Sequence, residues 1–206
     1  MTSPSAVKTT MRRAAIARRR RIPQKSLIEA GESLATVVMS TIPPLTPRDI
    51  VAAYVSMGTE IPTHPTLKAL LDTGATLLVP RLGSGEHDDV GWGRLESIDD
   101  LRHPQGRPRP SGYPDEPPGE RLGVNALRSA SFVLVPAFAV DSAGNRLGRG
   151  GGWYDRALRY VPPATPIAAV CWPWELVSAP LPAENHDMRV TIAVTPEGCA
   201  GFDNPA

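Results

Sequence analysis

Residues 146–156 read Arg-Leu-Gly-Arg-Gly-Gly-Gly-Trp-Tyr-Asp-Arg and place four glycines within five consecutive positions. An apolar stretch from Phe132 to Val140 precedes this segment, a polar turn from Asp141 to Asn145 separates the two, and Trp153 to Tyr160 has the composition of a helix. A strand, a glycine-rich turn and a helix in succession are typical of an α/β sheet. Because glycine carries no side chain, consecutive N–H groups of such a turn can converge on phosphate oxygens. The segment therefore predicts a phosphate site, to which the positive end of the following helix adds.

Short apolar stretches elsewhere in the chain have the length and composition of buried strands. They lie at Ile50–Val55, Thr76–Val79, Val90–Arg94, Ile167–Cys171 and Arg189–Val194. Helices are predicted before and between them. A basic helix is expected over about residues 5–21, Pro23 suits the first turn of a second helix, and Thr63 can cap a third. We therefore predict a single-domain α/β fold over residues 1–206, with a mixed, mostly parallel, Rossmann-like sheet covered by helices on both faces.

The composition excludes several classes of protein. Hydrophobic residues make up 41% of the chain and charged residues 21%, which is enough for a core and too balanced for a disordered chain. No stretch approaches the roughly 18 apolar residues that a membrane span needs. The two cysteines, Cys171 and Cys199, lack metal-ligand spacing, which argues against a zinc knuckle and favours a cytoplasmic location. The proline-rich stretch over about residues 102–123 predicts an irregular excursion.

Positive charge is concentrated at the N-terminus, where no acidic residue precedes Glu29. The cations there are Lys8, Arg12, Arg13, Arg18, Arg19, Arg20, Arg21 and Lys25. One interpretation is an arm that binds nucleic acid. The other is the solvated face of a helix, which would account for most of the arginines. Lys8 and Arg12 are four residues apart, so on a helix they project from one face and could grip one anion together.

Two common phosphate motifs do not fit the glycine-rich segment. A Walker A loop ends in Gly-Lys-Ser or Gly-Lys-Thr, and neither is present. A dinucleotide fingerprint that begins at Gly148 would need a glycine where Trp153 stands. A flexible turn before a helix is the simpler alternative. Asp155 could be a structural residue favoured by the helix dipole, or it could hold a magnesium ion beside phosphates.

The chain resembles the 5-formyltetrahydrofolate cyclo-ligase family, also called methenyltetrahydrofolate synthetases. The most specific similarity is the Val-Pro strand that begins at Val135 and ends in Asp141, followed by the segment from Arg146 to Arg156. Weaker matches follow the family's order along the chain. They are Lys8 with Arg12, Tyr54 to Met57 with Glu60 and Thr63, and Leu181-Pro182 with His186 and Asp187. Together these matches span nearly the whole chain.

This resemblance implies a ligase of one-carbon metabolism that closes a ring at the expense of ATP. It would convert 5-formyltetrahydrofolate to 5,10-methenyltetrahydrofolate and release ADP and phosphate. Phosphorylation of the formyl oxygen creates a good leaving group, and the neighbouring folate nitrogen then attacks the activated carbon. Phosphoryl transfer rests mostly on positioning and charge neutralisation, so no protein nucleophile is expected.

The resemblance also implies roles for individual residues. Those expected to bind ATP are Lys8, Arg12, Arg146, Leu147, Gly148, Arg149, Gly150, Gly151, Gly152, Trp153 and Tyr154. Those expected to bind the reduced folate are Val55, Glu60 and Tyr154, and Asp155 with Asp187 would hold Mg²⁺. Trp153 or Tyr154 could also stack on a flat ring. The expected partners are ATP and a reduced folate, with no nucleic acid and no membrane, and the protein is expected to be a monomer.

Two positions depart from the family's pattern, and several alternatives stay open. Arg149 stands where the family usually has an aromatic residue, and Thr191 stands where a second aspartate often follows Asp187. Taken without the resemblance, Val55 is more typical of a core residue and Glu60 of a solvated acid. Another ATP- or phosphate-using enzyme on the same scaffold and a nucleic-acid-binding protein are the alternative functions.

Overall fold

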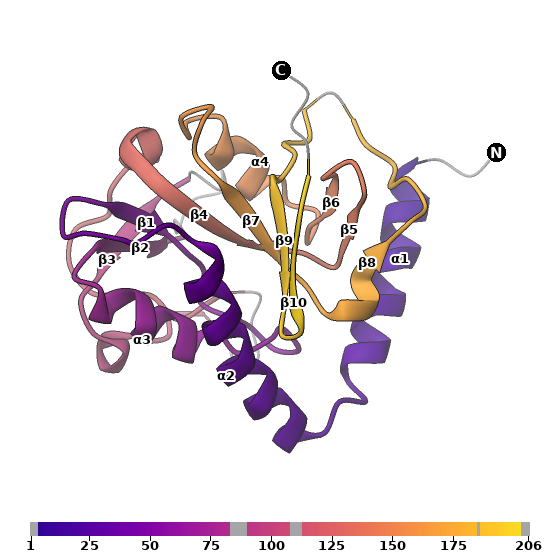
Figure 1. The fold of residues 1–206 in the computed structure, drawn as a ribbon, viewed down its shortest axis with the longest axis horizontal. Coiled ribbons are helices and arrows are strands. Elements are labelled where there is room, and N and C mark those ends of the chain that lie inside the picture. Colours follow the sequence, from indigo (N-terminus) through magenta and orange to yellow (C-terminus); the bar gives the residue numbers. More distant parts are fainter. Residues whose placement is uncertain (1–3, 83–89, 108–112, 185, 203–206) are drawn as a thin grey trace.

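The computed structural model describes residues 4–82, 90–107, 113–184 and 186–202, so residues 108–112 of the predicted proline-rich excursion lie outside it (Figure 1). Within the described residues the central sheet has seven strands in the order β10-β9-β7-β4-β1-β2-β3. The strands are β1 (Ile50–Ala52), β2 (Thr76–Pro80), β3 (Trp92–Leu95), β4 (Ala130–Pro136), β7 (Ile167–Val170), β9 (Ile192–Thr195) and β10 (Gly198–Gly201). The pairs from β9 to β2 are parallel, and β10 and β3 join the two edges antiparallel. The predicted mostly parallel sheet is confirmed.

Helices cover both faces of this sheet, as predicted. The helices are α1 (Pro4–Arg19), α2 (Gln24–Thr41), α3 (His64–Asp72) and α4 (Trp153–Leu158), with 3-10 turns at Ile98–Asp100, Val124–Ser129 and Pro173–Glu175. Figure 1 shows α2 and α3 together on one side of the sheet. Their buried Leu34 and Leu67 pack with Val51 of β1, whereas the next strand residue, Ala52, packs in the second core with Leu158 of α4. Alternate side chains of a strand point to opposite faces, so one strand supplies both cores.

A second, smaller sheet was not predicted. The apolar stretch Phe132–Val140 was expected to form one strand, but it divides into β4 and β5 (Ala139–Asp141), and β5 pairs with β6 (Arg146–Leu147) and β8 (Leu176–Val177). After Pro136, the Ala137 N–H still donates to Val170 of β7, at 3.0 Å, whereas the Phe138 N–H donates to Leu147 of β6, at 2.7 Å. The chain therefore changes sheets within two residues. This change brings the glycine-rich segment to the end of the central strands.

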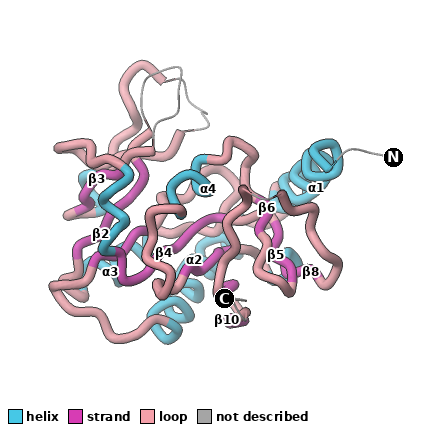
Figure 2. The backbone as a smooth tube through the Cα atoms, turned by 90° about the horizontal axis from the view of Figure 1, so that it is seen from above, coloured by secondary structure: helices cyan, strands magenta, loops and turns pink. Residues whose placement is uncertain are grey.

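Helix α1 packs against the smaller sheet and not against the central one. Figures 1 and 2 both show β5, β6 and β8 between α1 and the central strands. Met11, Ala15 and Ile16 contact the buried cluster of Phe138, Ala139, Leu147 and Leu181. Arg13, Arg18, Arg20 and Arg21 are exposed, as a solvated face predicts for most of these arginines, whereas Arg19 is 3% exposed and is the exception. Among the described helices, none combines the length and the apolar character that a membrane crossing requires.

Three local predictions are wrong in detail. Thr63 does not cap α3 with its side chain, because its hydroxyl donates to the Tyr54 carbonyl at 2.9 Å and accepts from the Ser56 N–H. Pro23 lies one position before α2, as its N-cap, with extended backbone. Helix α4 ends at Leu158, two residues before the predicted end at Tyr160. With only six residues, it contributes a smaller helix dipole than the predicted helix would.

The strand order has a switch point at β1. From β1 the chain passes to β2 on one side and later returns to β4 on the other. In open parallel sheets, a crevice forms at the carboxyl ends of the strands where the order reverses in this way. Tyr54 and Val55 follow β1 at this end, and Pro136 ends β4 there.

Candidate active site

A cavity of about 490 Å³ occupies the crevice at this switch point. That volume lies within the range of roughly 300–1,000 Å³ that is usual for small-molecule sites. All the residues with predicted site roles line it, although they come from distant parts of the chain. They are Lys8, Arg12, Val55, Glu60, Arg146, Leu147, Gly148, Arg149, Gly150, Gly151, Gly152, Trp153, Tyr154, Asp155 and Asp187.

The glycine-rich loop, residues 148–152, presents its backbone N–H groups without protein acceptors. None of these five N–H groups donates a hydrogen bond to another residue that the structure describes. The loop's carbonyls contact cations instead: Arg12 Nε donates to the Gly148 carbonyl at 2.7 Å and Arg156 Nη1 to the Gly151 carbonyl at 2.9 Å. Gly150 and Gly152 have φ values of 103° and 64°, which glycine adopts without steric cost. The hydrogen bonds to its carbonyls thus hold the loop in place, and its N–H groups remain available to an anion.

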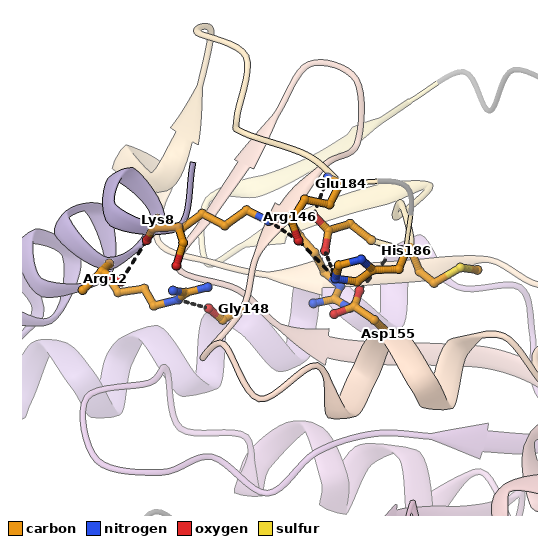
Figure 3. A network of polar contacts seen from close by, with 11 residues as sticks. Lys8, Arg12, Arg146, Gly148, Asp155, Glu184 and His186 are labelled. Atoms are coloured by element: carbon orange, nitrogen blue, oxygen red, sulfur yellow. Dashed lines mark hydrogen bonds and ion pairs between the residues drawn. The ribbon is translucent and has the colours of Figure 1, made fainter. Parts of the chain in front are cut away.

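Besides Arg156, three cations from α1 and β6 lie near the loop and line the cavity: Lys8, Arg12 and Arg146. Figure 3 shows Lys8 and Arg12 on α1 facing the region of Arg146 and Gly148. Lys8 Nζ lies 2.8 Å from Asp187 Oδ2, and the side chain is 13% exposed. Arg146 is 4% exposed, its Nη2 lies 2.7 Å from Asp155 Oδ1, and its Nε has no hydrogen-bond partner among the described residues. Burial lowers the pKa of Arg146, but an arginine stays charged because its ordinary pKa is far above neutral. A buried cation with a free donor is suited to an anionic ligand.

Two carboxylates stand beside these cations. Asp155 Oδ1 accepts from Arg146 and from the Met188 N–H at 3.0 Å, and no described residue donates to its Oδ2. Asp187 Oδ2 accepts from Lys8 and from the Glu184 N–H at 2.9 Å. Burial alone would raise the pKa of Asp187, but the hydrogen bonds from Lys8 and Glu184 outweigh it and lower the pKa below the ordinary 3.8. The carboxylate is therefore ionised at neutral pH.

The oxygen atoms of these two carboxylates have the chemistry of magnesium ligands. Mg²⁺ takes oxygen ligands and is commonly held by one or two carboxylates together with substrate phosphates. Ligand atoms of Glu184, His186 and Asp187 lie within 4.8 Å of one another, so a further carboxylate is close to Asp187. Thr191, at the position where the family often has a second aspartate, does not line the cavity, because its hydroxyl bonds to the backbone of Ile167.

The two aromatic residues after the glycines pack against each other. The centroid of the Trp153 ring lies 5.1 Å from the centroid of the Trp92 ring and 4.8 Å from that of the Tyr154 ring. The planes of the Trp153 and Tyr154 rings meet at 77°, which is an edge-to-face arrangement. Burial, followed by the charge of Glu60, raises the pKa of Tyr154, so its hydroxyl is neutral and can donate a hydrogen bond. Both residues line the cavity, and their mutual packing fixes the wall beside the loop.

Glu60 is buried, contrary to its interpretation as a solvated acid. It is 6% exposed and lies near Val55, which is 3% exposed. Its Oε2 accepts from the Met57 N–H at 2.7 Å, and its Oε1 accepts from Arg149 Nε at 3.1 Å and Arg149 Nη2 at 3.0 Å. A buried carboxylate costs free energy unless its oxygens are hydrogen-bonded, and here both oxygens have partners. Val55 is buried in the core, as its apolar character predicts, and it also lines the cavity.

The sequence reasoning missed several residues that line the cavity. Tyr54 and Met57 belong to the stretch that matches the family, but they were given no role in the site. Glu184 precedes the His186-Asp187 pair by two positions, and Tyr113 follows the part of the proline-rich stretch that lies outside the described residues. The position of Tyr113 could not be predicted, because no pattern in that irregular stretch indicates which residue lies at the site.

The chain is similar to proteins of known family over almost its whole length. The sequence model of the 5-formyltetrahydrofolate cyclo-ligase family matches residues 4–196. A 5-formyltetrahydrofolate cyclo-ligase of Mycolicibacterium smegmatis is 32% identical over 92% of this chain and 94% of its own. The protein of the same name from Escherichia coli K12 is 30% identical over 87% of this chain and 94% of its own.

Solved structures show the same fold. The Aquifex aeolicus 5,10-methenyltetrahydrofolate synthetase superimposes with a TM-score of 0.72 at 23% identity, over 97% of this chain and 95% of its own. A 5,10-methenyltetrahydrofolate synthetase from Mycoplasma pneumoniae gives a TM-score of 0.68 at 14% identity, over 92% and 98% of the two chains. The mixed sheet with helices on both faces is thus shared with these proteins.

Proposed function

The chain belongs to the 5-formyltetrahydrofolate cyclo-ligase family, and from that premise we propose how its cavity carries out the family's reaction. The reaction is the ATP-dependent cyclisation of 5-formyltetrahydrofolate to 5,10-methenyltetrahydrofolate, with release of ADP and phosphate. Its chemistry requires a triphosphate and a reduced folate to lie side by side, with the γ-phosphorus next to the formyl oxygen.

One observation carries the proposal for the site. A single cavity is lined both by an anion-binding group, which is Lys8, Arg12 and the free N–H groups of residues 148–152, and by the buried carboxylate of Glu60 with Val55. The first group suits phosphates, because positive charge and backbone donors stabilise anions. The second suits a heterocycle with N–H donors and an apolar face. The two ligands of the reaction need these two environments next to each other.

The ATP triphosphate would lie along the glycine-rich loop. The N–H groups of residues 148–152 would donate to phosphate oxygens, while Lys8, Arg12 and Arg146 supply positive charge from both sides. Arg149, Leu147, Trp153 and Tyr154 complete this wall, and the packed rings of Trp153 and Tyr154 hold the loop against the central sheet. The free Nε of Arg146 would gain an acceptor when a phosphate enters, which would remove the cost of an unsatisfied buried donor.

The reduced folate would lie against Val55, Glu60 and Tyr154. Glu60 is held in place by the Met57 N–H and would accept hydrogen bonds from the N–H groups of the pterin ring. Charge-assisted hydrogen bonds of this kind orient a ligand as well as bind it. Val55 and Tyr154 offer apolar surface to the ring. This placement would leave the formyl group directed toward the phosphates.

Asp155 and Asp187 would hold Mg²⁺ beside the phosphates, with Glu184 near enough to assist. When bound, the ion neutralises phosphate charge and helps to orient the γ-phosphate. The residues of the chain would orient both reactants and neutralise the rest of the charge. The formyl oxygen attacks the γ-phosphorus and the bond to ADP breaks; the neighbouring folate nitrogen then attacks the formyl carbon, and phosphate leaves.

No protein nucleophile enters this scheme. Cys171 is buried and does not line the cavity, and burial raises the pKa of its thiol to about 12, so it stays protonated. Catalysis would therefore come from orientation of the reactants and from charge stabilisation, which together can supply much of the barrier reduction.

We also propose that the protein acts as a cytoplasmic monomer without nucleic acid. Both cysteines are free, which suits a reducing compartment. Three arginines of the N-terminal cluster already have internal contacts: Arg12 with Gly148, Arg18 with Trp174 and Arg19 with Glu175. Light scattering of the purified protein should give the mass of one chain, and a labelled oligonucleotide should not bind at physiological ionic strength.

The proposed function is tested by a spectrophotometric assay of the purified protein. Absorbance from 5,10-methenyltetrahydrofolate should rise only when ATP, Mg²⁺ and 5-formyltetrahydrofolate are all present, and ADP should accumulate in equal amount. A complete mixture that yields no product would refute the proposal, and so would a rise that does not depend on ATP.

A further inference from the structure

Arg149 of the glycine-rich loop forms an ion pair with Glu60 of the proposed folate site. Two nitrogens of its guanidinium lie 3.1 and 3.0 Å from the same oxygen of Glu60. The two residues are 89 positions apart, and both line the cavity, Arg149 in the proposed nucleotide site and Glu60 in the proposed folate site. Arg149 therefore donates two hydrogen bonds to the one Glu60 oxygen that the Met57 N–H does not contact.

The two partners differ in their freedom to move. The Glu60 side chain is 4% exposed, whereas that of Arg149 is 44% exposed. The backbone around Arg149 is held by Arg12, which donates to the Gly148 carbonyl and lies against Gly150. Glu60 is fixed on its other oxygen by the Met57 N–H. The mobile part of the contact is therefore the Arg149 side chain, which can swing while its backbone and Glu60 stay in place.

A triphosphate on the loop would give Arg149 a second partner. Guanidinium groups bind phosphates with paired hydrogen bonds, and Arg149 lies within the loop whose N–H groups have no protein acceptors. When Arg149 turns to phosphate, Glu60 remains buried with one oxygen unpartnered. Such an oxygen is costly until a donor reaches it, and the N–H groups of a folate are suitable donors.

We propose that Arg149 couples the two sites: it blocks Glu60 until nucleotide binds, so ATP increases the affinity for folate. This inference rests on the proposed function, because it assumes that Glu60 binds folate and that the loop binds ATP. It assigns Arg149 as a positioning residue that acts through Glu60. By linkage, folate increases the affinity for ATP by the same factor.

Calorimetry of the whole protein tests the coupling. The Kd of 5-formyltetrahydrofolate is measured with and without a saturating non-hydrolysable ATP analogue and Mg²⁺, and the ratio of the two values is the coupling factor. We expect about a fivefold to 50-fold ratio for the unchanged protein, within the usual range of allosteric couplings. In Arg149→Met the ratio should fall close to one. Folate alone should bind more tightly to this variant, because nothing occupies Glu60.

Matched variants separate coupling from general damage. Arg149→Gln should behave like Arg149→Met, and it serves in its place if the latter does not fold. Arg48→Met removes an exposed arginine from the loop before β1, at the opposite end of the strands from the cavity, and should keep the full ratio. A merely structural role of Arg149 would weaken folate binding under both conditions and would leave the ratio unchanged.

Each outcome of the experiment is decisive. The inference stands if the ratio in the Arg149 variants is closer to one than to the unchanged protein's value on a logarithmic scale. It is overturned if the ratio is closer to that value, or if the unchanged protein itself shows no coupling. Turnover of the unchanged protein is assayed in parallel: product without coupling rejects only this inference, whereas absence of product rejects the proposed function and the inference with it.

Discussion

Arg19 and Glu175 form a buried ion pair that ties α1 to the body of the protein. Arg19 Nε and Nη2 lie 2.7 and 2.6 Å from the two carboxylate oxygens of Glu175, and both side chains are 3% exposed. Arg19 Nη2 also donates to the Ala137 carbonyl, and Glu175 accepts from the Trp172 N–H at 2.8 Å. The pair thus joins the end of α1 to the point where the chain changes sheets. Since α1 carries Lys8 and Arg12, the pair also determines where these cations stand.

Arg19→Met should destabilise the protein by about 3–5 kcal/mol, because it leaves a buried carboxylate without its counter-charge. Urea unfolding followed by circular dichroism measures the change in the free energy of unfolding. The double variant Arg19→Met with Glu175→Met should recover part of the loss, since it removes the unpaired charge. Arg20→Met changes the exposed neighbour of Arg19 and should alter the unfolding free energy by less than about 0.5 kcal/mol. Equal losses at positions 19 and 20 would contradict this account.

Asp141 should make the free energy of unfolding depend on pH. It is 1% exposed and accepts hydrogen bonds from the N–H groups of Ala143, Asn145 and Leu181 and from the Asn145 side chain. Burial would raise its pKa, but these hydrogen bonds outweigh burial and lower the pKa below 3.8. A carboxyl whose pKa is lowered in the folded state stabilises that state above its unfolded pKa of about 3.9 and loses the effect as pH falls through the folded value.

Asp141→Asn is therefore expected to cost about 1–3 kcal/mol at pH 7, since its amide nitrogen would face N–H donors. The difference between the variant and the unchanged protein should shrink as pH falls below about 4, because Asp141 is protonated first in the unfolded chain and only at lower pH in the folded protein. Unfolding free energies measured at several pH values between 7 and 3 provide the check. A difference that stays constant over this range would show that the ionised form of Asp141 is not what stabilises the turn.

Gly150 and Gly151 should respond differently to alanine. Gly150 has a φ of 103°, and a Cβ there would lie 3.2 Å from the Arg12 guanidinium carbon. Gly151 lacks a positive φ, and a Cβ there would meet nothing within 4 Å. Gly150→Ala should cost about 1–2 kcal/mol of stability, whereas Gly151→Ala should cost well under 1 kcal/mol. Thermal unfolding of the two variants in parallel measures this contrast, and equal destabilisation would mean that the loop has another conformation.

Lys8 and Glu60 should affect the two substrates separately. Lys8→Ala removes a phosphate contact of about 1–3 kcal/mol, so the KM for ATP should rise about tenfold and the KM for folate much less. Glu60→Gln should raise the KM for folate without weakening the binding of ATP. Lys68→Ala, at an exposed lysine of α3, is the control and should change neither constant. If each variant raised both constants equally, the two residues would act on the structure of the site and not on separate ligands.

The sequence was sufficient for the parts of the fold that have a local signal. The central strands are apolar stretches with turns at both ends, and four glycines between a strand and a helix indicate a phosphate loop. The site residues predicted from the family resemblance all line one cavity, because the fold brings the separate segments that carry the matches together at the switch point. Their functional roles remain predictions.

The remaining features depend on contacts between distant residues. The strands β6 and β8 have two residues each, which is too short for any periodic pattern. Arg19 and Glu175 are 156 positions apart, and nothing in the arginine-rich stretch distinguishes Arg19 from its exposed neighbours. The departure of Arg149 from the family pattern was visible in the sequence, but its contact with Glu60 is visible only in the fold. Such pairs form because tertiary packing brings them out of water together.

A crystal structure of the protein with Mg²⁺ and a non-hydrolysable ATP analogue tests the central claim most directly. The account predicts that triphosphate oxygens lie within hydrogen-bond distance of N–H groups in residues 148–152, with Lys8 and Arg12 on the same phosphates. A nucleotide bound elsewhere while the N–H groups of this loop stay without acceptors would contradict it.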